Sequence, residues 1–297
     1  MWQGVIPAVT TKFDEDGGLD FVEMRRCYRM LMDAGCDGLV ACGSLGEGPM
    51  LKHGERIDVL KLCKEATGSK PALLTIAEAA TRDACALAEK AAKAGADGIM
   101  VVPSPIYHTD RRETVATLRA VAAAGGLPVM IYSNRIAYRV DVTTDMLEEL
   151  ADDPRFVAVK ESSDDIRRTI EIANRLGSRY DIFTGVDNLA YEALAVGAVG
   201  WIAGVMAFPR ETVAIYRLMK AGRHSEALAI YRWFRPLLDL DVSTYLVQNL
   251  KLVEALVIAT NDRVRGPRLS HTGQRRAEIE LLVKNALAKR PTLPDFA

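Results

Sequence analysis

The stretch Asp33-Ala34-Gly35-Cys36-Asp37-Gly38-Leu39-Val40 has a close counterpart in Lys93-Ala94-Gly95-Ala96-Asp97-Gly98-Ile99-Met100, 60 residues further along the chain. In each copy the first glycine can end a helix, and the Asp-Gly pair can start the strand that follows. A weaker copy, Val196-Gly197-Ala198-Val199-Gly200-Trp201, appears a hundred residues later. Such repetition predicts a fold assembled from similar strand-and-helix units.

Eight short apolar segments extend this pattern over the first two thirds of the chain. Their hydrophobicity is nearly unbroken, which is typical of parallel strands that are covered on both faces. They are residues 5–10, 38–42, 72–76, 98–102, 128–132, 156–160, 181–184 and 199–203. Helical patterns lie between them, for example at residues 21–34, 53–67 and 82–94. Eight alternating units predict a closed (β/α)₈ barrel (TIM barrel) of the α/β class. The alternative, a Rossmann-like sheet, lacks its Gly-x-Gly-x-x-Gly sequence after any predicted strand.

No strand pattern follows Pro209, and the rest of the chain is helical in pattern. The predicted helices lie near residues 210–221, 225–239, 244–260 and 273–288. This is more helix than one barrel unit needs. We therefore expect residues 1–209 to form the barrel core. Residues 210–297 should add its last helix and a C-terminal helical extension within the same structural unit.

The composition is that of an ordinary globular protein, with 49% apolar and 26% charged residues. The 38 basic and 39 acidic residues leave a net charge of −1, which indicates neither a nucleic-acid-binding surface nor attraction to an anionic membrane. The sequence starts without the basic and apolar regions of a signal peptide and contains no long apolar run. We expect a cytoplasmic protein that acts on a small molecule, with no nucleic-acid or membrane partner.

The cysteines and histidines favour neither disulfides nor a metal site. The five cysteines are odd in number and irregularly spaced, which favours reduced core thiols. Only Cys42, which precedes a Gly-Ser loop, is placed to act as a nucleophile, and no histidine accompanies it. The four histidines, at positions 53, 108, 224 and 271, are not paired at ligand spacing, so we expect no metal.

Lys160 is the sharpest candidate for chemistry. Barrel active sites lie at the carboxyl ends of the strands, and Lys160 ends the apolar segment Phe156-Val157-Ala158-Val159. A lysine desolvated by apolar walls has a lowered pKa, so its neutral amine can attack a ketone and form an imine. Such chemistry needs no cofactor. The alternative is a strand-end lysine that reaches out to water.

Two further strand ends carry suitable groups. Tyr132 ends the preceding segment and could relay protons, since a phenol both donates and accepts; it could equally be a core tyrosine. The Gly43-Ser44-Leu45-Gly46-Glu47 stretch opens a helix, whose backbone N–H groups could hold a carboxylate; it could also be an ordinary turn.

Two other classes of protein remain as alternatives at this stage. Gly185 and Gly204 follow the last two predicted strands, where many barrels bind phosphate. No lysine or arginine adjoins either glycine, which disfavours a phosphate site. A non-catalytic metabolite-binding barrel is the other alternative, and the joint presence of Lys160, Tyr132 and Tyr107 argues against it.

The whole chain resembles the dihydrodipicolinate synthase and N-acetylneuraminate lyase family of class I Schiff-base lyases. The family motif Gly-(Ser/Thr)-x-Gly-Glu is matched by residues 43–47, its strand-five tyrosine by Tyr132, and its imine lysine by Lys160. The resemblance implies that Ser44, Tyr107 and Tyr132 relay protons, with Tyr107 supplied across a dimer interface as in relatives. It also implies a homo-oligomer, a dimer or a homotetramer. The substrate-binding positions that it implies are Gly43, Leu45, Tyr138, Gly185 and Gly204.

Two departures from the family pattern bear on the substrate. The synthases usually carry an arginine six residues after the strand-five tyrosine, and here that position is Tyr138. The second threonine of the glycine loop is replaced by Leu45, so one hydroxyl group is lost. A phenol does not substitute for an arginine fork in binding a carboxylate.

These departures favour the catabolic branches of the family. The segments around residues 132–141 and 203–210 are similar to those of 1-pyrroline-4-hydroxy-2-carboxylate deaminases of hydroxyproline breakdown and of 2-keto-3-deoxy sugar acid dehydratases. We expect a lyase that eliminates water or ammonia from a small 2-oxo or 2-imino acid. Dihydrodipicolinate synthase, 2-keto-3-deoxy sugar acid dehydratase or aldolase, and N-acetylneuraminate lyase remain alternatives.

Overall fold

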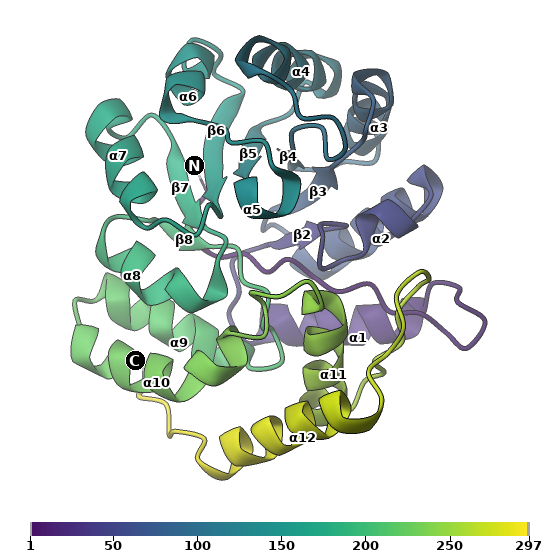
Figure 1. The fold of residues 1–297 in the computed structure, drawn as a ribbon, viewed down its shortest axis with the longest axis vertical. Helices are drawn as coiled ribbons and strands as arrows, with labels where there is room; N and C mark the ends of the chain where they lie inside the picture. Colours follow the sequence, from purple (N-terminus) through teal and green to yellow (C-terminus); the bar gives the residue numbers. More distant parts are fainter. Residues whose placement is uncertain (1, 296–297) are drawn as a thin grey trace.

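The computed structural model describes residues 2–295, which contain eight parallel strands in a single curved sheet (Figure 1). The strand order is β1-β8-β7-β6-β5-β4-β3-β2. A parallel bridge between Ala8 and Val40 joins the continuation of β1 to β2. There the N–H of Val40 donates to the carbonyl of Pro7 at 2.7 Å, and the N–H of Val9 donates to the carbonyl of Val40 at 3.0 Å. These contacts close the sheet, so the predicted (β/α)₈ barrel is confirmed.

The strands are short and nearly all of their residues are buried. They are β1 (Gly4–Val5), β2 (Leu39–Ala41), β3 (Ala72–Ile76), β4 (Gly98–Val101), β5 (Val129–Ser133), β6 (Phe156–Glu161), β7 (Asp181–Thr184) and β8 (Gly200–Trp201). β1 and β8 are shorter than the predicted segments 5–10 and 199–203. Single backbone hydrogen bonds nevertheless continue their pairing as far as Ala8 and Ala203, which lie 2.9 Å apart from N to O.

Helices surround the barrel, one or more after each strand. They are α1 (Phe21–Asp33), α2 (His53–Thr67), α3 (Thr81–Lys93), α4 (Arg111–Gly125), α5 (Arg135–Tyr138), α6 (Thr144–Leu150), α7 (Arg167–Leu176), α8 (Ala190–Ala195), α9 (Pro209–Lys220), α10 (His224–Leu238), α11 (Leu246–Ile258) and α12 (Gly273–Ala288), with 3₁₀ turns η1 (Gly48–Met50) and η2 (Asp187–Leu189). Across residues 2–295, no helix has the length and apolar character needed to cross a membrane.

The sequence repeat has a clear structural counterpart. Gly35 and Gly95 follow α1 and α3 with φ values of +97° and +81°, a conformation in which glycine is favoured, as predicted for helix ends. The aspartates that follow have an additional role. The carboxylate of Asp37 accepts a hydrogen bond from the N–H of Val5 at 2.9 Å, and that of Asp97 accepts one from Ala72 at 2.8 Å. Each repeat therefore fixes the start of a neighbouring strand.

The core has two parts, and their alternation orients Lys160. One cluster fills the barrel interior and includes Ala158, whereas a second lies between the strands and the helices and includes Val159. Successive side chains of a strand point to opposite faces. Lys160 therefore shares the inner face with Ala158, one step closer to the carboxyl end of β6.

The C-terminal helix α11 is joined to the barrel by two buried ion pairs. In α11, Lys251 contacts Glu47 of the glycine loop and Glu254 contacts Lys12, with N–O distances of 2.5 Å in both pairs. Figure 1 shows α12 running along the edge of the molecule, away from the strands. We propose, as before, that residues 210–297 form one structural unit with the barrel, and these buried pairs support that proposal.

Candidate active site

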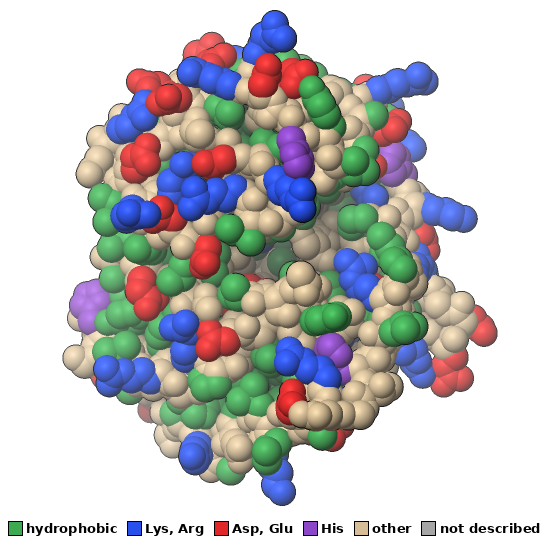
Figure 2. Space-filling view, viewed as in Figure 1, with side chains coloured by type: hydrophobic (Ala, Val, Ile, Leu, Met, Phe, Trp, Pro, Cys, Tyr) green, Lys and Arg blue, Asp and Glu red, His purple; other side chains and the backbone are tan. Residues whose placement is uncertain are grey.

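A small cavity of about 100 Å³ lies at the carboxyl ends of the strands. Its walls come from the ends of β5 and β6, from the segments after β2, β7 and β8, and from the loop between α10 and α11. The lining residues are Ala8, Gly43, Ser44, Leu45, Met100, Tyr132, Asn134, Ala137, Lys160, Gly185, Ile202, Gly204, Asp241 and Leu246. The space-filling view in Figure 2 shows a hollowed face on which acidic, basic and apolar side chains are interspersed.

Lys160 is buried, with 6% of its surface exposed, and its amine is not neutralised by contact with a carboxylate. The Nζ atom lies 4.0 Å from the centre of the Tyr132 ring. Among residues 2–295 this atom has no hydrogen-bond or ion-pair partner. Burial lowers the pKa of Lys160, while the charges of Asp241, Tyr138 and Asp187 oppose this shift. The neutral, nucleophilic amine is therefore more accessible than in an exposed lysine.

Three hydroxyl groups lie beside Lys160. The Tyr132 hydroxyl accepts a hydrogen bond from Nδ2 of Asn134 at 3.0 Å, and the hydroxyls of Ser44 and Tyr138 are hydrogen-bonded to each other. The two tyrosine rings meet edge to face at 5.7 Å. Burial raises the pKa of Tyr132 and raises that of Tyr138 to about 12. Both phenols are therefore protonated at neutral pH, as a proton relay requires.

Because Gly185 has no side chain, the side chain of Lys160 can pack directly against its backbone. A Cβ atom at this position would lie 2.2 Å from Cε of Lys160 and 2.2 Å from Oγ of Ser162. Any larger residue would therefore displace the lysine. At Gly204, a Cβ atom would lie 2.8 Å from Oδ1 of Asp241 and 3.3 Å from Oδ2 of Asp187.

Those two carboxylates are the part of the site that sequence reasoning missed. Asp187 is fully buried and accepts hydrogen bonds from Nε1 of Trp201 at 2.8 Å, from the N–H of Gly204 at 3.0 Å and from the N–H of Val205 at 2.6 Å. Its position directly after β7 was a usable signal, because barrel sites occur there. Asp241 lies in the loop between α10 and α11, where the sequence pattern offers no such signal. The two acidic groups and the occupied N–H of Gly204 exclude the phosphate site considered above.

The glycine loop offers unoccupied donors. Gly43, Ser44 and Leu45 all line the cavity. Among the described residues, no acceptor is hydrogen-bonded to the backbone N–H of Ser44 or of Leu45. These two groups are free to bind the carboxylate of a small acid, and that role of the loop stays a prediction.

The other predicted residues lie away from the cavity. Tyr107 is 60% exposed, and its hydroxyl donates to Glu113 at 3.2 Å. One chain alone thus does not bring Tyr107 to Lys160, and its supply across an interface stays a prediction. Cys42 is buried, and burial raises the pKa of its thiol to about 12, which makes it a poor nucleophile. All five cysteines are unpaired.

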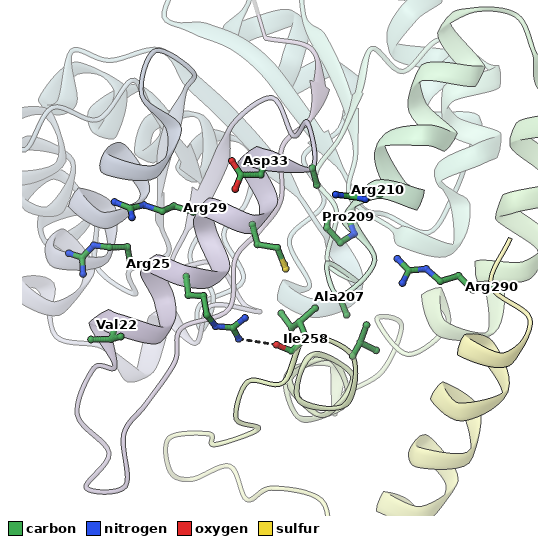
Figure 3. A pocket seen from close by; sticks show the side chains of 13 residues that line it. Val22, Arg25, Arg29, Asp33, Ala207, Pro209, Arg210, Ile258 and Arg290 are labelled. Carbon is green, nitrogen blue, oxygen red and sulfur yellow. Dashed lines mark hydrogen bonds between the residues drawn. The ribbon is translucent and has the colours of Figure 1, made fainter. Parts of the chain in front are cut away.

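A larger cleft of about 720 Å³ lies on the outside of the barrel, between α1, the start of α9 and the end of α11 (Figure 3). Its arginines are mostly paired with carboxylates. Arg25 and Arg29 contact Glu65, Arg26 contacts Glu23, and Arg290 contacts Glu211. Because its charges are largely compensated and it lacks a nucleophile, we place the chemistry in the smaller cavity.

A closed barrel with a buried lysine at its mouth, without an ion-pair partner among residues 2–295, has the fold of the class I Schiff-base lyases, and this protein is an enzyme of that class. Residues 1–286 match the Dihydrodipicolinate synthetase family, and the chain belongs to this family. The predicted family is thereby confirmed.

Relatives of known name agree with this membership. The 4-hydroxy-tetrahydrodipicolinate synthase 1 of Streptomyces coelicolor is 35% identical over 78% of this chain and 76% of its own. Synthase 2 of that organism is 31% identical over 93% of each chain. The solved dihydrodipicolinate synthase of Aquifex aeolicus has a TM-score of 0.90 at 26% identity and covers 97% of this chain and 98% of that one. A catalytic lysine mutant of a Ruminococcus gnavus sialic acid aldolase shares the fold, with a TM-score of 0.89 at 22% identity over 97% of each chain.

Proposed function

We propose that this enzyme forms an imine between Lys160 and a small 2-oxo or 2-imino acid and then eliminates water or ammonia from it, in the manner of a 1-pyrroline-4-hydroxy-2-carboxylate deaminase. The observation that carries the proposal is the buried amine of Lys160, which faces the cavity without a hydrogen-bond or ion-pair partner among residues 2–295. In this setting the amine is both desolvated and open to a substrate carbonyl.

The hydroxyl groups supply the proton transfers for imine formation. Nζ of Lys160 attacks C2 of the substrate, and a proton moves from nitrogen to oxygen to give a carbinolamine. The Tyr132 phenol protonates the hydroxyl that leaves as water, and the C2 iminium forms. Because burial raises the pKa of Tyr132, the resulting phenolate is a strong base and can remove a proton from C3. A 2-imino acid reaches the same iminium by exchanging its own nitrogen for Nζ.

The cavity favours elimination over condensation with a second carboxylate substrate. Tyr138 occupies the position of the usual arginine and is engaged with Ser44. Arg135 and Arg139, the two nearby arginines that could replace it, are both exposed and do not line the cavity. Leu45 contributes no hydroxyl, and the buried carboxylate of Asp187 repels a further carboxylate.

The second candidate function is condensation of pyruvate with aspartate semialdehyde. The observation that favours it is that the relatives described above are named 4-hydroxy-tetrahydrodipicolinate synthases. Losing a charge-assisted contact of about 1.5–3 kcal/mol would weaken binding of the second substrate roughly 10- to 150-fold. We therefore expect elimination to be much the faster of the two reactions.

Two assays test the proposal. Borohydride reduction in the presence of candidate acids should leave a mass adduct on Lys160. Side-by-side kinetics should then show elimination from a hydroxylated 2-oxo or 2-imino acid and little condensation. A condensation kcat/KM above about 10⁴ M⁻¹s⁻¹, at the bottom of the ordinary enzyme range, would restore the synthase assignment. No adduct with any 2-oxo acid would remove the imine mechanism altogether.

We further propose a cytoplasmic homo-oligomer, a dimer or a tetramer. The five unpaired cysteines support a reducing compartment. The exposed Tyr107 supports an interface, because the resemblance places this residue at a partner's site. Light scattering would give the oligomer size. A monomer with full activity would contradict the assembly.

A further inference from the structure

The cavity around Lys160 has two chemically different sides. On the side of β5 and the glycine loop lie the hydroxyls of Tyr132, Ser44 and Tyr138 and the unoccupied N–H groups of residues 44 and 45. On the side of β7 and β8 the carboxyl group of Asp241 lines the cavity, and that of Asp187 lies behind it, next to Gly204. Lys160 is the only cation that lines the cavity among the described residues.

This asymmetry orients the substrate. A substrate carboxylate is attracted to the N–H groups of the glycine loop and repelled by the ionised carboxylate of Asp187. The part of the acid remote from its carboxylate must therefore face Asp187 and Asp241. In an elimination, that part carries the leaving group.

The two carboxyl groups have different surroundings, which decides where a shared proton resides. Burial raises the pKa of Asp187, but both of its oxygens accept N–H hydrogen bonds, from Trp201, Gly204 and Val205, and these donors favour the ionised form and oppose that rise. Among residues 2–295, the single donor to the Asp241 carboxyl group is the backbone N–H of Asp187. The titratable groups that influence it are Asp187 in η2, Lys160 in β6 and Tyr132 in β5.

Asp241 is therefore the member of the pair that holds a proton. Burial and the neighbouring Asp187 carboxylate raise the pKa of Asp241 to about 8, while Lys160 opposes this rise. Two carboxyl groups with unequal surroundings are a common arrangement for separating acid and base roles. Only Asp241 reaches the cavity wall, whereas Asp187 supports it from behind Gly204.

We propose that Asp241 is the proton donor to the leaving group of the elimination, an inference that rests on the proposed function. Tyr132 removes the C3 proton of the lysine iminium to give an enamine. The enamine then expels the C4 hydroxyl: the C4–O bond breaks with its electron pair, a C3–C4 double bond forms and the iminium is restored. The Asp241 proton joins the departing oxygen, and water leaves. The water that later hydrolyses the iminium returns a proton to the Asp241 carboxylate, so the cycle closes with the net loss of one water from the substrate.

The test compares two leaving groups in the wild type and in Asp241→Asn. The substrates are a 4-hydroxy-2-oxo acid and its 4-fluoro analogue, since fluoride leaves without needing a proton. Asp241→Asn should still trap the Lys160 imine with borohydride, lose about 10²-fold in kcat on the hydroxy acid, and lose at most a few-fold on the fluoro acid. Asp239→Asn is the matched control, because Asp239 lies two residues away on the surface, paired with Arg235. It should change neither rate.

The pH profile provides an independent readout that does not depend on the stability of a variant. In the wild type, kcat/KM for the hydroxy acid should fall as pH rises above about 8, where Asp241 loses its proton. The profile for the fluoro acid should lack this fall. Equal losses on both substrates in Asp241→Asn, unchanged kcat on the hydroxy acid, or identical alkaline limbs for both substrates would overturn the inference. Failure to trap any imine in the wild type would instead remove the proposed function on which the inference rests.

Discussion

Lys160 and Lys251 are both buried lysines of the same barrel, yet their surroundings differ completely. Lys251 is fully buried and donates to Oε1 of Glu47 at 2.5 Å and to the carbonyl of Arg263 at 2.7 Å. Lys160 faces the ring of Tyr132 and has no acceptor among residues 2–295. Burial lowers the pKa of both amines, to about 8 for Lys251, where the Glu47 carboxylate opposes the shift.

Desolvation alone therefore does not make a lysine a nucleophile. The amine of Lys251 donates to Glu47 and to the carbonyl of Arg263, so the ion pair offsets the free-energy cost of burying the charge. The pair connects two segments that lie 204 residues apart in the sequence. The same arrangement is repeated by Lys12 and Glu254. Lys160 instead lies at a cavity, where a substrate carbonyl can reach its lone pair.

Substituting each lysine in turn tests whether the two have different roles. Lys160→Ala and Lys160→Arg should both lower kcat by about 10⁴-fold or more, because alanine lacks an amine and arginine cannot lose its proton. Both variants should stay folded by circular dichroism, since no ion pair is broken. Substantial residual turnover in either variant, measured against a substrate-free control, would contradict the imine mechanism.

Lys251→Ala should have the opposite profile. Removing Lys251 leaves Glu47 with the more distant guanidinium of Arg268 at 3.8 Å and the N–H of Arg265 at 2.9 Å. Loss of the close partner of a buried pair should lower the free energy of unfolding by about 3–5 kcal/mol. Urea unfolding would measure this loss, and the protein that remains folded should still form a borohydride-trapped imine. Lys61→Ala, which removes an exposed lysine near Asp58, is the control and should change stability by less than about 1 kcal/mol. Loss of imine trapping in folded Lys251→Ala would contradict a purely structural role for Lys251.

Tyr132→Phe separates the aromatic ring beside Lys160 from its hydroxyl. The phenyl ring retains the packing, so substrate binding should hardly change, whereas kcat should fall by about 10²-fold through loss of proton transfer. Steady-state kinetics distinguish the two effects, with the exposed Tyr245→Phe as the matched control. A raised KM at constant kcat would make Tyr132 a binding residue instead.

The carboxyl group of Asp241, near Lys160, also predicts a pH dependence of stability. The folded pKa of Asp241, about 8, lies above the value of about 3.9 for an unfolded aspartate. The folded state therefore binds more protons between these values, and this contribution to stability is present at low pH and is lost as pH rises through about 8. Urea midpoints of the wild type and Asp241→Asn at pH 5, 6, 7 and 8 should diverge in favour of the variant with rising pH. If the difference between the two urea midpoints did not change with pH, the pKa of Asp241 would not be raised in the folded state.

The sequence determined the barrel and the position of Lys160. Apolar runs, glycine-terminated helices and their repetition are local patterns, and backbone hydrogen bonding within strands and helices follows from them. The strand-end rule then placed Tyr132, Lys160, Gly43 and Gly185 at one mouth, because parallel strands bring all their carboxyl ends to the same side. The sequence pattern did not predict where β1 and β8 end, because individual backbone hydrogen bonds continue their pairing beyond the regular strands.

Only the tertiary structure decided which groups surround the lysine and which do not. Asp241 reaches Gly204 from a loop beyond the last strand, and Ser44 meets the Tyr138 hydroxyl from 94 residues away. Tyr107 points to Glu113 and solvent instead of to Lys160. The physical reason is that desolvation and pairing depend on distances between segments remote in sequence. A local pattern can therefore identify a buried lysine, but whether it meets a carboxylate, as Lys251 does, or an open cavity, as Lys160 does, is set by the packing of the whole chain.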